Sequence, residues 1–275
     1  MTKSKILVLG GDKRLDYVYD ILTKKQRCCL RINDIKENFF AAIKDSDYVM
    51  LPVPTCNKNG YIYSENKNFS LSCAEFSEAL SVKNIVFGCN ISKELKYYMN
   101  KKNIVYHDLN VSEEFLTYNA YLTAQSVLRL LLERTQELIT DKKILITGFG
   151  RVAKATAITF KSFIPDITIC ARRSEQINEA QCLGFKTITY DKLCTEVSDK
   201  DYILNTVPEK VFDENIIRLF SDETEYFELA SPPYGAEQNI FFKLNKNYIL
   251  ASGLPGKFTP RSAGKKIVEI IEKLI

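Results

Sequence analysis

The sequence predicts an α/β protein with two Rossmann-like domains, each built on a parallel sheet wrapped by helices, joined by a long helix. Apolar segments of strand length alternate with segments of helical periodicity across residues 1–115, and the alternation starts again near residue 140. The intervening segment, residues 112–140, contains neither Gly nor Pro. A length of 275 residues also suits two domains of ordinary size, each with its own core.

The composition is that of a globular protein and gives no indication of a nucleic-acid partner. Hydrophobic residues make up 45% of the chain and charged residues 26%, and the net charge of +4 is small for this length. Lys and Arg alternate with Asp and Glu along most segments, so no basic stripe faces a phosphate backbone. We therefore expect no binding to DNA or RNA.

The beginning of the chain and its cysteines bear on location and metal binding. The first apolar run, residues 6–10, is too short for a signal peptide or a membrane span, so we expect a cytoplasmic protein without a membrane partner. The eight cysteines are scattered without a CxxC pair, and His107 is the single histidine. This pattern argues against a zinc site and favours reduced, structural thiols, so no metal is expected.

The elements expected in the first half alternate between strands and helices. Strands are expected at residues 5–10, 47–53, 84–89 and 103–107, and helices at 15–25 and 91–102. Ser112 suits the N-cap of the long helix, with Glu113 and Glu114 in its first turn. Residues 116–140 then form the connecting helix between the domains.

The second half repeats the alternation. Strands are expected at residues 142–147, 167–171, 201–205, 225–229 and 247–251, and helices from Arg151, from Ser174 and over 260–275. In two-domain dehydrogenases such a last helix often packs back onto the first domain. We therefore predict a first domain over residues 1–115 completed by 253–275, and a second domain over 141–252.

A glycine motif opens the second domain. In the segment ILITGFGRVAKA, Gly148, Gly150 and Ala153 have the G-x-G-x-x-A spacing, between a strand and a helix that starts with Arg151 and Val152. The first Gly permits a tight turn, the second lets the backbone approach a pyrophosphate, and the Ala lets helix and strand pack closely. The alternative is an ordinary strand-to-helix turn, but the flanking segments favour a dinucleotide site.

The end of the next strand indicates which dinucleotide binds. An NAD enzyme would place Asp or Glu there to bind the ribose 2′-hydroxyl, whereas this chain has Ala171, Arg172, Arg173 and Ser174. Guanidinium groups form charge-assisted bonds to a 2′-phosphate, which a carboxylate would repel. These residues could instead be solvated charges on a loop, but their position favours NADP, with Arg172 the better candidate for the contact.

Polar and turn-forming residues follow two further strands. Asn205, Thr206, Val207 and Pro208 come after the apolar run DYIL and suit close approach to a ribose, and the segment ELASPPYG ends the following strand with a double proline. Either segment could simply end a strand. Their places on successive strand ends favour cofactor contacts.

The first domain offers strand ends without a nucleotide motif. The segment GGDKR, which ends with Arg14, lacks the G-x-G-x-x-G spacing and suits a substrate domain. Pro54 and Thr55 end one strand, and Asn90 follows another. We expect these ends to face those of the second domain across a cleft where a substrate meets the nicotinamide.

In order and spacing, several segments resemble the A subunits of the dipicolinate synthase family of spore-forming bacteria. They are GGDKR, LPVP, GFGRVAK with ARRS, NTVP, LAS and SGLPGKFTPRSAG, and they span nearly the whole chain. The resemblance implies a fold similar to the two-domain hydroxyacid dehydrogenases. It also implies NADP-linked oxidation of dihydrodipicolinate to dipicolinate (pyridine-2,6-dicarboxylate) in the mother cell during sporulation, and a partner, the flavoprotein-like B subunit. Whether the chain also forms a homo-oligomer stays open.

The family pattern also points to catalytic residues, with departures. The pattern N-x-x-P-T-x-E-G corresponds here to NAYLTAQS, so Asn119 and Thr123 fit, whereas Gln125 replaces a glutamate. Gln125 can form hydrogen bonds but cannot act as a base near neutral pH. Similarly, Pro232 stands where a basic residue is expected, which puts one carboxylate contact in doubt.

The substrate implied by the resemblance carries two carboxylates that the chain must hold. The backbone of the glycine-rich segment is a candidate for one of them, through Gly253, Leu254, Pro255 and Gly256. Candidates for the other are Arg14, Asn90, Thr55, Thr123, Lys257 and Arg261, although a solvated charge is an equally good interpretation of each basic side chain. His107 has no visible partner that would make it an acid or base.

Two other functions remain open at this point. The fold would also suit another NADP-linked oxidoreductase of a small anionic substrate, such as a hydroxyacid or shikimate-type dehydrogenase, and NTVP resembles the shikimate-type pattern. The GLPG segment favours the dipicolinate synthase family instead. The departures at Gln125 and Pro232 would also fit a non-catalytic NADP-binding subunit.

Overall fold

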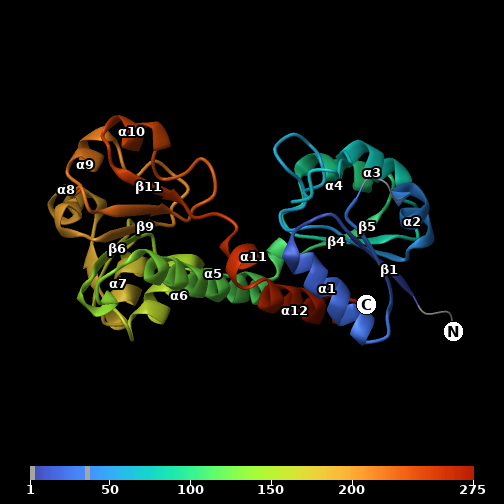
Figure 1. Ribbon diagram of the computed structural model, residues 1–275, viewed down its shortest axis with the longest axis horizontal. Coiled ribbons are helices and arrows are strands. Elements are labelled where there is room, and N and C mark those ends of the chain that lie inside the picture. Colours follow the sequence, from blue (N-terminus) through green and yellow to red (C-terminus); the bar gives the residue numbers. More distant parts are fainter. Residues whose placement is uncertain (1–3, 35–37) are drawn as a thin grey trace. The chain divides into compact units, whose positions relative to one another are not determined.

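The computed structural model describes residues 4–34 and 38–275, which form two compact units (Figure 1). One unit comprises the chain up to Asn119 together with Pro255–Ile275, and the other comprises Ala120–Leu254. Each unit contains one parallel sheet with helices around it, so the predicted fold class is confirmed. No helix within the described part of the chain is both long and apolar enough to cross a membrane.

The N-terminal unit has a five-stranded sheet in the order β2-β1-β3-β4-β5. Its strands are β1 (Lys5–Leu9), β2 (Cys28–Ile32), β3 (Tyr48–Met50), β4 (Ile85–Gly88) and β5 (Val105–Asp108). Its helices are α1 (Lys13–Lys24), α2 (Phe39–Asp45), α3 (Cys73–Ala79), α4 (Lys93–Lys101) and the short 3-10 helix η1 (Leu109–Val111). Buried apolar residues on both faces of this sheet explain why the strands are nearly continuous hydrophobic runs.

The last helix of the chain, α12 (Pro260–Ile271), packs against α1 in the same unit, and Figure 1 shows the two side by side. Its apolar face contributes Ile267, Val268 and Ile271 to the core beside β1. Gly264 lies at the contact, where a Cβ atom would come within 2.7 Å of the Arg14 carbonyl oxygen and 2.9 Å of Tyr17 Cβ. Only a glycine lets the two backbones approach this closely.

This contact predicts an unequal response of two neighbouring positions on α12. Gly264→Ala should lower the free energy of unfolding by about 1–3 kcal/mol, because the backbone of α1 has to move to admit a methyl group. Lys265→Ala, on the exposed side of the same helix, should change it by less than about 0.5 kcal/mol. Urea denaturation of both variants checks this, and equal effects would contradict the packing argument.

The second unit has a six-stranded sheet in the order β11-β10-β9-β6-β7-β8. Its strands are β6 (Lys143–Thr147), β7 (Asp166–Cys170), β8 (Lys186–Ile188), β9 (Tyr202–Asn205), β10 (Glu225–Glu228) and β11 (Asn247–Leu250). Its helices are α6 (Arg151–Phe160), α7 (Ser174–Cys182), α8 (Leu193–Glu196), α9 (Glu214–Arg218) and α10 (Gln238–Lys243), with 3-10 helices η2 (Ile139–Asp141), η3 (Tyr190–Lys192) and η4 (Val197–Asp199). The strand order reverses between β6 and β9, which is the switch point where such sheets bind ligands.

The long helix α5 (Glu113–Arg134) begins in the first unit and ends in the second. Ser112 caps it as predicted, because its hydroxyl oxygen accepts a hydrogen bond from the Phe115 amide. The helix ends at Arg134, however, six residues before the expected end at residue 140. Arg134 forms an ion pair with Glu225, and the Thr135 hydroxyl accepts a hydrogen bond from the Glu137 amide, so side-chain contacts end the helix without Gly or Pro.

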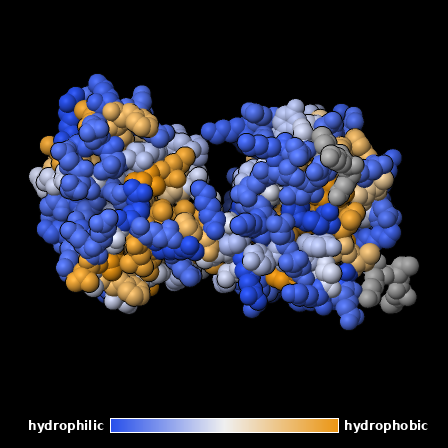
Figure 2. All heavy atoms as spheres, viewed as in Figure 1, coloured by the Kyte–Doolittle hydropathy of each residue, from blue (hydrophilic) through white to orange (hydrophobic). Residues whose placement is uncertain are grey.

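On the face drawn in Figure 2, hydrophilic residues cover most of the surface of each unit, with apolar patches among them. Some large apolar side chains are exposed, with Val111 at 81% and Phe242 at 75%. Such single exposures are usual for a globular protein and need no partner.

Candidate functional site

The turn after β6 requires its first glycine. Gly148 has a φ of +82°, and a Cβ atom there would lie 2.9 Å from both Thr206 Oγ1 and Val207 Cγ2. Its amide donates a 2.7 Å hydrogen bond to the Cys170 carbonyl oxygen at the end of β7. The turn is therefore held between the strands on either side of β6, where both the backbone angle and the space exclude other residues.

The second glycine of the motif faces open space. Gly150 is the N-cap of α6, and a Cβ atom there would meet no atom within 4 Å. The first turn of α6 contains no acidic residue, and Ala153 is fully buried beneath it. The free amides and positive dipole end of this helix therefore face a space that suits a pyrophosphate.

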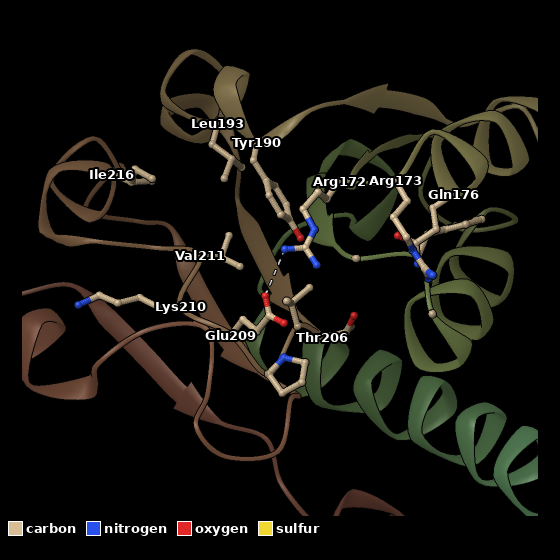
Figure 3. Close-up of a pocket in the computed structure, with 15 residues that line it drawn as sticks. Arg172, Arg173, Gln176, Tyr190, Leu193, Thr206, Glu209, Lys210, Val211 and Ile216 are labelled. Carbon is tan, nitrogen blue, oxygen red and sulfur yellow. Dashed lines mark hydrogen bonds and ion pairs between the residues drawn. The ribbon is translucent and has the colours of Figure 1, made fainter.

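Next to this turn lies a cavity of about 490 Å³ (Figure 3). The loops after β6, β7, β8 and β9 form its walls, so it lies at the carboxyl ends of the strands. Its lining residues are Gly148, Phe149, Gly150, Arg172, Arg173, Gln176, Tyr190, Leu193, Thr206, Val207, Pro208, Glu209, Lys210, Val211 and Ile216. The combination of an apolar wall and convergent polar groups is typical of a cofactor site.

The two arginines after β7 both line this cavity, and both are exposed. Arg172 Nη1 lies 3.5 Å from Glu209 Oε2, with side chains that are 70% and 66% exposed (Figure 3). An ion pair this exposed contributes little, so the guanidinium remains available to an incoming anion. Arg173 is the N-cap residue of α7 and lies beside Gln176, while Ala171 is buried behind it.

The loop after β9 divides into a buried residue and an exposed edge. The Asn205 side chain is fully buried, and it bonds to Thr147 Oγ1, the Val207 backbone and Glu228. Asn205 therefore holds the loop in place. This role differs from the direct contact with the cofactor that the sequence predicts for it. Thr206, Val207 and Pro208 line the cavity and remain candidates for that contact.

Several lining residues were not identified from the sequence. Tyr190 and Leu193 follow β8, a strand of three residues whose short apolar pattern gives no clear signal. Burial raises the pKa of the Tyr190 hydroxyl to about 12, so it stays protonated at neutral pH and can donate a hydrogen bond. Glu209, Lys210 and Val211 continue the segment NTVP, and extending that strand end by three residues would have found them.

In the N-terminal unit, Arg14 has a structural role rather than the free contact expected of it. It is 6% exposed, and its Nε and Nη2 atoms donate to the Asp12 carboxylate at 2.6–3.0 Å. Nη2 also donates to the Val53 carbonyl oxygen. The pair therefore ties the loop after β1 to the loop after β3.

Thr55, also a predicted substrate contact, is fully buried as well. Its hydroxyl donates to the Cys89 carbonyl oxygen at 3.0 Å and accepts from the Cys89 amide at 3.2 Å. Pro54 follows β3 and Asn90 follows β4, next to these hydrogen bonds. Both residues are exposed and remain candidates for substrate contact.

The glycine-rich segment near the C-terminus is partly helical, as α11 (Leu254–Phe258). A Cβ atom on Gly256 would lie 2.6 Å from Asp12 Oδ2 and 3.1 Å from Arg14 Nε, so this glycine packs against the ion pair. Leu254 and Pro255 are buried, whereas Gly253 is exposed with a φ of +66°. The expectation that the whole segment presents backbone to a carboxylate is therefore corrected to its exposed start at Gly253.

The three predicted catalytic residues lie on α5 but not on one face. Asn119 and Thr123 are one helical turn apart and half-buried, so they share a face. Gln125 is exposed and lies about 200° around the helix from Thr123. Gln125 is therefore separated from the other two. His107 stacks on Phe87, with ring centroids 5.2 Å apart.

No group of three or more His, Cys, Asp or Glu side chains that could hold a metal ion occurs among residues 4–34 and 38–275.

The two glycines of the nucleotide turn give a matched test. Gly148→Ala should cost roughly 2–4 kcal/mol of stability, because it is strained and collides with Thr206 and Val207. Gly150→Ala should cost less than about 1 kcal/mol, yet weaken dinucleotide binding at least about tenfold by filling the space at the helix terminus. Urea denaturation and calorimetric titration measure both effects, and unchanged binding by the Gly150 variant would contradict the assignment of the site.

Comparison with known proteins shows what the chain is similar to. Residues 5–110 match the family model that describes the N-terminal domain of the dipicolinate synthase A subunit. The whole chain is 24% identical over 291 residues to the A subunit of dipicolinate synthase from Bacillus subtilis, covering 97% of that protein.

Solved structures agree on the fold. The A subunit of dipicolinate synthase from Bacillus halodurans superimposes with a TM-score of 0.85 at 22% identity, covering 98% of this chain and 97% of the other. An oxidoreductase of D-3-phosphoglycerate dehydrogenase type from Ralstonia solanacearum has a TM-score of 0.59 at 13% identity, covering 98% and 95% of the two chains. The predicted likeness to two-domain dehydrogenases is thus confirmed for the fold, and along its whole length the chain is similar to the A subunit of Bacillus subtilis dipicolinate synthase.

Proposed function

We propose that this chain is the NADP-dependent A subunit of a dipicolinate synthase, which oxidises dihydrodipicolinate to dipicolinate in the mother cell of a spore-forming bacterium. The observation that carries the cofactor is the open helix terminus at Gly150 beside a cavity with two exposed arginines. The full-length likeness to the A subunit of Bacillus subtilis dipicolinate synthase supports both the substrate and a partner in the form of a separate B subunit.

Preference for NADP follows from the charges at the end of β7. Arg172 and Arg173 are the first exposed residues after the strand, at the position where an acidic residue would bind a ribose 2′-hydroxyl. A 2′-phosphate there can replace the exposed Glu209 as the partner of Arg172. Arg172 then pairs with a doubly charged anion in place of a singly charged carboxylate. The Ser174 hydroxyl, at the first position of α7, can donate a further hydrogen bond.

The proposed oxidation requires little acid–base catalysis from the protein. A bound nicotinamide supplies the hydride acceptor, and the aromatic product supplies the driving force. The protein's part is to orient the ring, and Asn119 and Thr123, which share one face of α5, are the candidates for contacts with it. Gln125 is neutral and lies on another side of the helix, so the proton released on oxidation passes to solvent or to another nearby group.

Two other functions are outcomes of the same experiments. Another NADP-linked oxidoreductase of a small anionic substrate would share the nucleotide site and differ in substrate. A non-catalytic NADP-binding subunit is favoured by one observation, that Arg14 and Thr55 are buried and occupied by internal hydrogen bonds.

The arginines provide the test of cofactor preference. Arg172→Ala and Arg173→Ala should together weaken NADP binding by about 10–100-fold, the loss expected for hydrogen bonds to a charged group, and leave NAD binding nearly unchanged. Lys192→Ala removes an exposed charge that does not line the cavity, so it serves as control. Isothermal titration with both nucleotides measures this, and equal losses for NADP and NAD would refute the assignment of the 2′-phosphate site.

The reaction is tested with the purified chain, a source of dihydrodipicolinate and NADP, with and without a B subunit. Dipicolinate should form with a stoichiometric rise in NADPH absorbance, and Arg172→Ala should slow it at limiting NADP. If the chain binds NADP but no dipicolinate forms with or without the B subunit, the result would support the non-catalytic role and contradict the enzyme function. Oxidation of a different small anion would instead support the other oxidoreductase class.

A further inference from the structure

A buried carboxylate lies at the carboxyl ends of the strands in the second unit. Glu228, the last residue of β10, is fully buried. Parallel register places it opposite Asn205, the last residue of β9, and Asn205 opposite Thr147, the last residue of β6. The three side chains thus form a row across the carboxyl ends of the strands at the switch point of the sheet.

The hydrogen bonds to Glu228 come from neutral groups. Oε1 accepts from Asn205 Nδ2 at 2.7 Å and from the Ala230 amide at 3.0 Å. Oε2 accepts from the Tyr226 hydroxyl at 2.8 Å and from the Gly235 amide at 2.9 Å. Within the described residues, no Lys or Arg forms an ion pair with this carboxylate.

The chemistry of the neighbouring groups fixes which of them donate to Glu228. Asn205 Oδ1 faces the Val207 amide, an obligate donor, and this fixes Nδ2 toward Glu228. Two backbone amides and the Asn205 amide can only donate, so a protonated carboxyl would have to give its proton to the Tyr226 oxygen. Burial, together with Glu228, raises the pKa of the Tyr226 hydroxyl well above its usual range, so this hydroxyl keeps its proton and donates to the carboxylate.

A buried negative charge without a positive partner is costly, and a ligand can offset part of that cost. In a doubly wound sheet each half binds one mononucleotide, and the pyrophosphate crosses at the switch point. Here the half with β6, β7 and β8 carries the arginines and suits the adenosine 2′-phosphate end. The nicotinamide end then belongs to the half with β9, β10 and β11, where Glu228 ends the central strand.

We propose that the buried carboxylate of Glu228 makes the nucleotide site selective for the oxidised form of the dinucleotide. The oxidised nicotinamide ring is a cation and the reduced ring is neutral, so a fixed negative charge beside it favours the oxidised form. This inference rests on the proposed function, because it assumes a nicotinamide dinucleotide that extends from the cavity to the carboxyl ends of β9 and β10.

This selectivity suits a reaction that runs toward an aromatic product. Favouring the oxidised ring lowers the driving force of hydride transfer at the site, but aromatisation leaves the step strongly downhill. In return, NADP⁺ competes better with NADPH for the free site, and the reduced product leaves more readily. Glu228 would therefore determine which redox form of the dinucleotide binds more tightly, and it would not contact the substrate.

The test compares two variants of this network in the full chain. Glu228→Gln removes the charge and keeps the side-chain shape, so the Kd for NADP⁺ should rise relative to that for NADPH by about tenfold. Tyr226→Phe removes one hydrogen bond to the same carboxylate and keeps its charge, so the ratio of the two Kd values should stay within about twofold. Calorimetry for NADP⁺ and fluorescence for NADPH provide the constants, with thermal unfolding as a check on folding.

The outcomes separate this inference from the proposed function. Equal weakening of both redox forms by Glu228→Gln would mean that Glu228 only shapes the loops, and would overturn the inference. Wild-type protein that binds neither form would overturn the proposed function. If Glu228→Gln does not fold, the wild type alone still decides, because clearly tighter binding of NADPH than of NADP⁺ contradicts the inference.

Discussion

The Asn205 side chain is the interaction on which the nucleotide half of the molecule depends. Its amide spans the carboxyl ends of three parallel strands, because it meets Thr147 at the end of β6 and Glu228 at the end of β10. It also bonds to both backbone polar groups of Val207, which fixes the loop against which Gly148 packs. Gly235 belongs to the same cluster, since a Cβ atom there would lie 2.2 Å from Asn205 Nδ2. One buried amide therefore sets the positions of the loops that line the cavity.

In the N-terminal unit, a buried ion pair holds the loops at the strand ends in place. The Asp12–Arg14 pair, also almost fully buried, ties together the loops after β1 and β3. Gly256 lets the C-terminal segment close onto this pair, and Gly264 lets α12 lie against α1. A chain segment from the far end of the sequence thus completes this unit, and two glycines allow its close approach.

The sequence predicts the sheets well because parallel strands buried on both faces leave continuous apolar runs, as in ILIT before Gly148. It also predicts the glycine turn after β6, since the G-x-G-x-x-A spacing reflects local backbone geometry. The end of α5 could not be predicted, because the ion pair from Arg134 to Glu225 joins residues that are far apart in the chain. The wall formed by Tyr190 and Leu193 was missed for a related reason, as β8 is too short to show a period.

Predictions of direct contact were the weakest for polar residues near strand ends. Arg14, Thr55 and Asn205 all looked like ligand contacts, yet each is buried and satisfied by the protein itself. A polar residue at a strand end can bind a ligand directly, or it can hold in place a loop that binds the ligand. The residue type and position are the same in both cases, so sequence alone does not separate them. Burial separates them, and it leaves Arg172 and Arg173 exposed in the cavity. It also brings out Glu228, the first residue of the segment ELASPPYG, whose fully buried carboxylate accepts its hydrogen bonds from neutral donors.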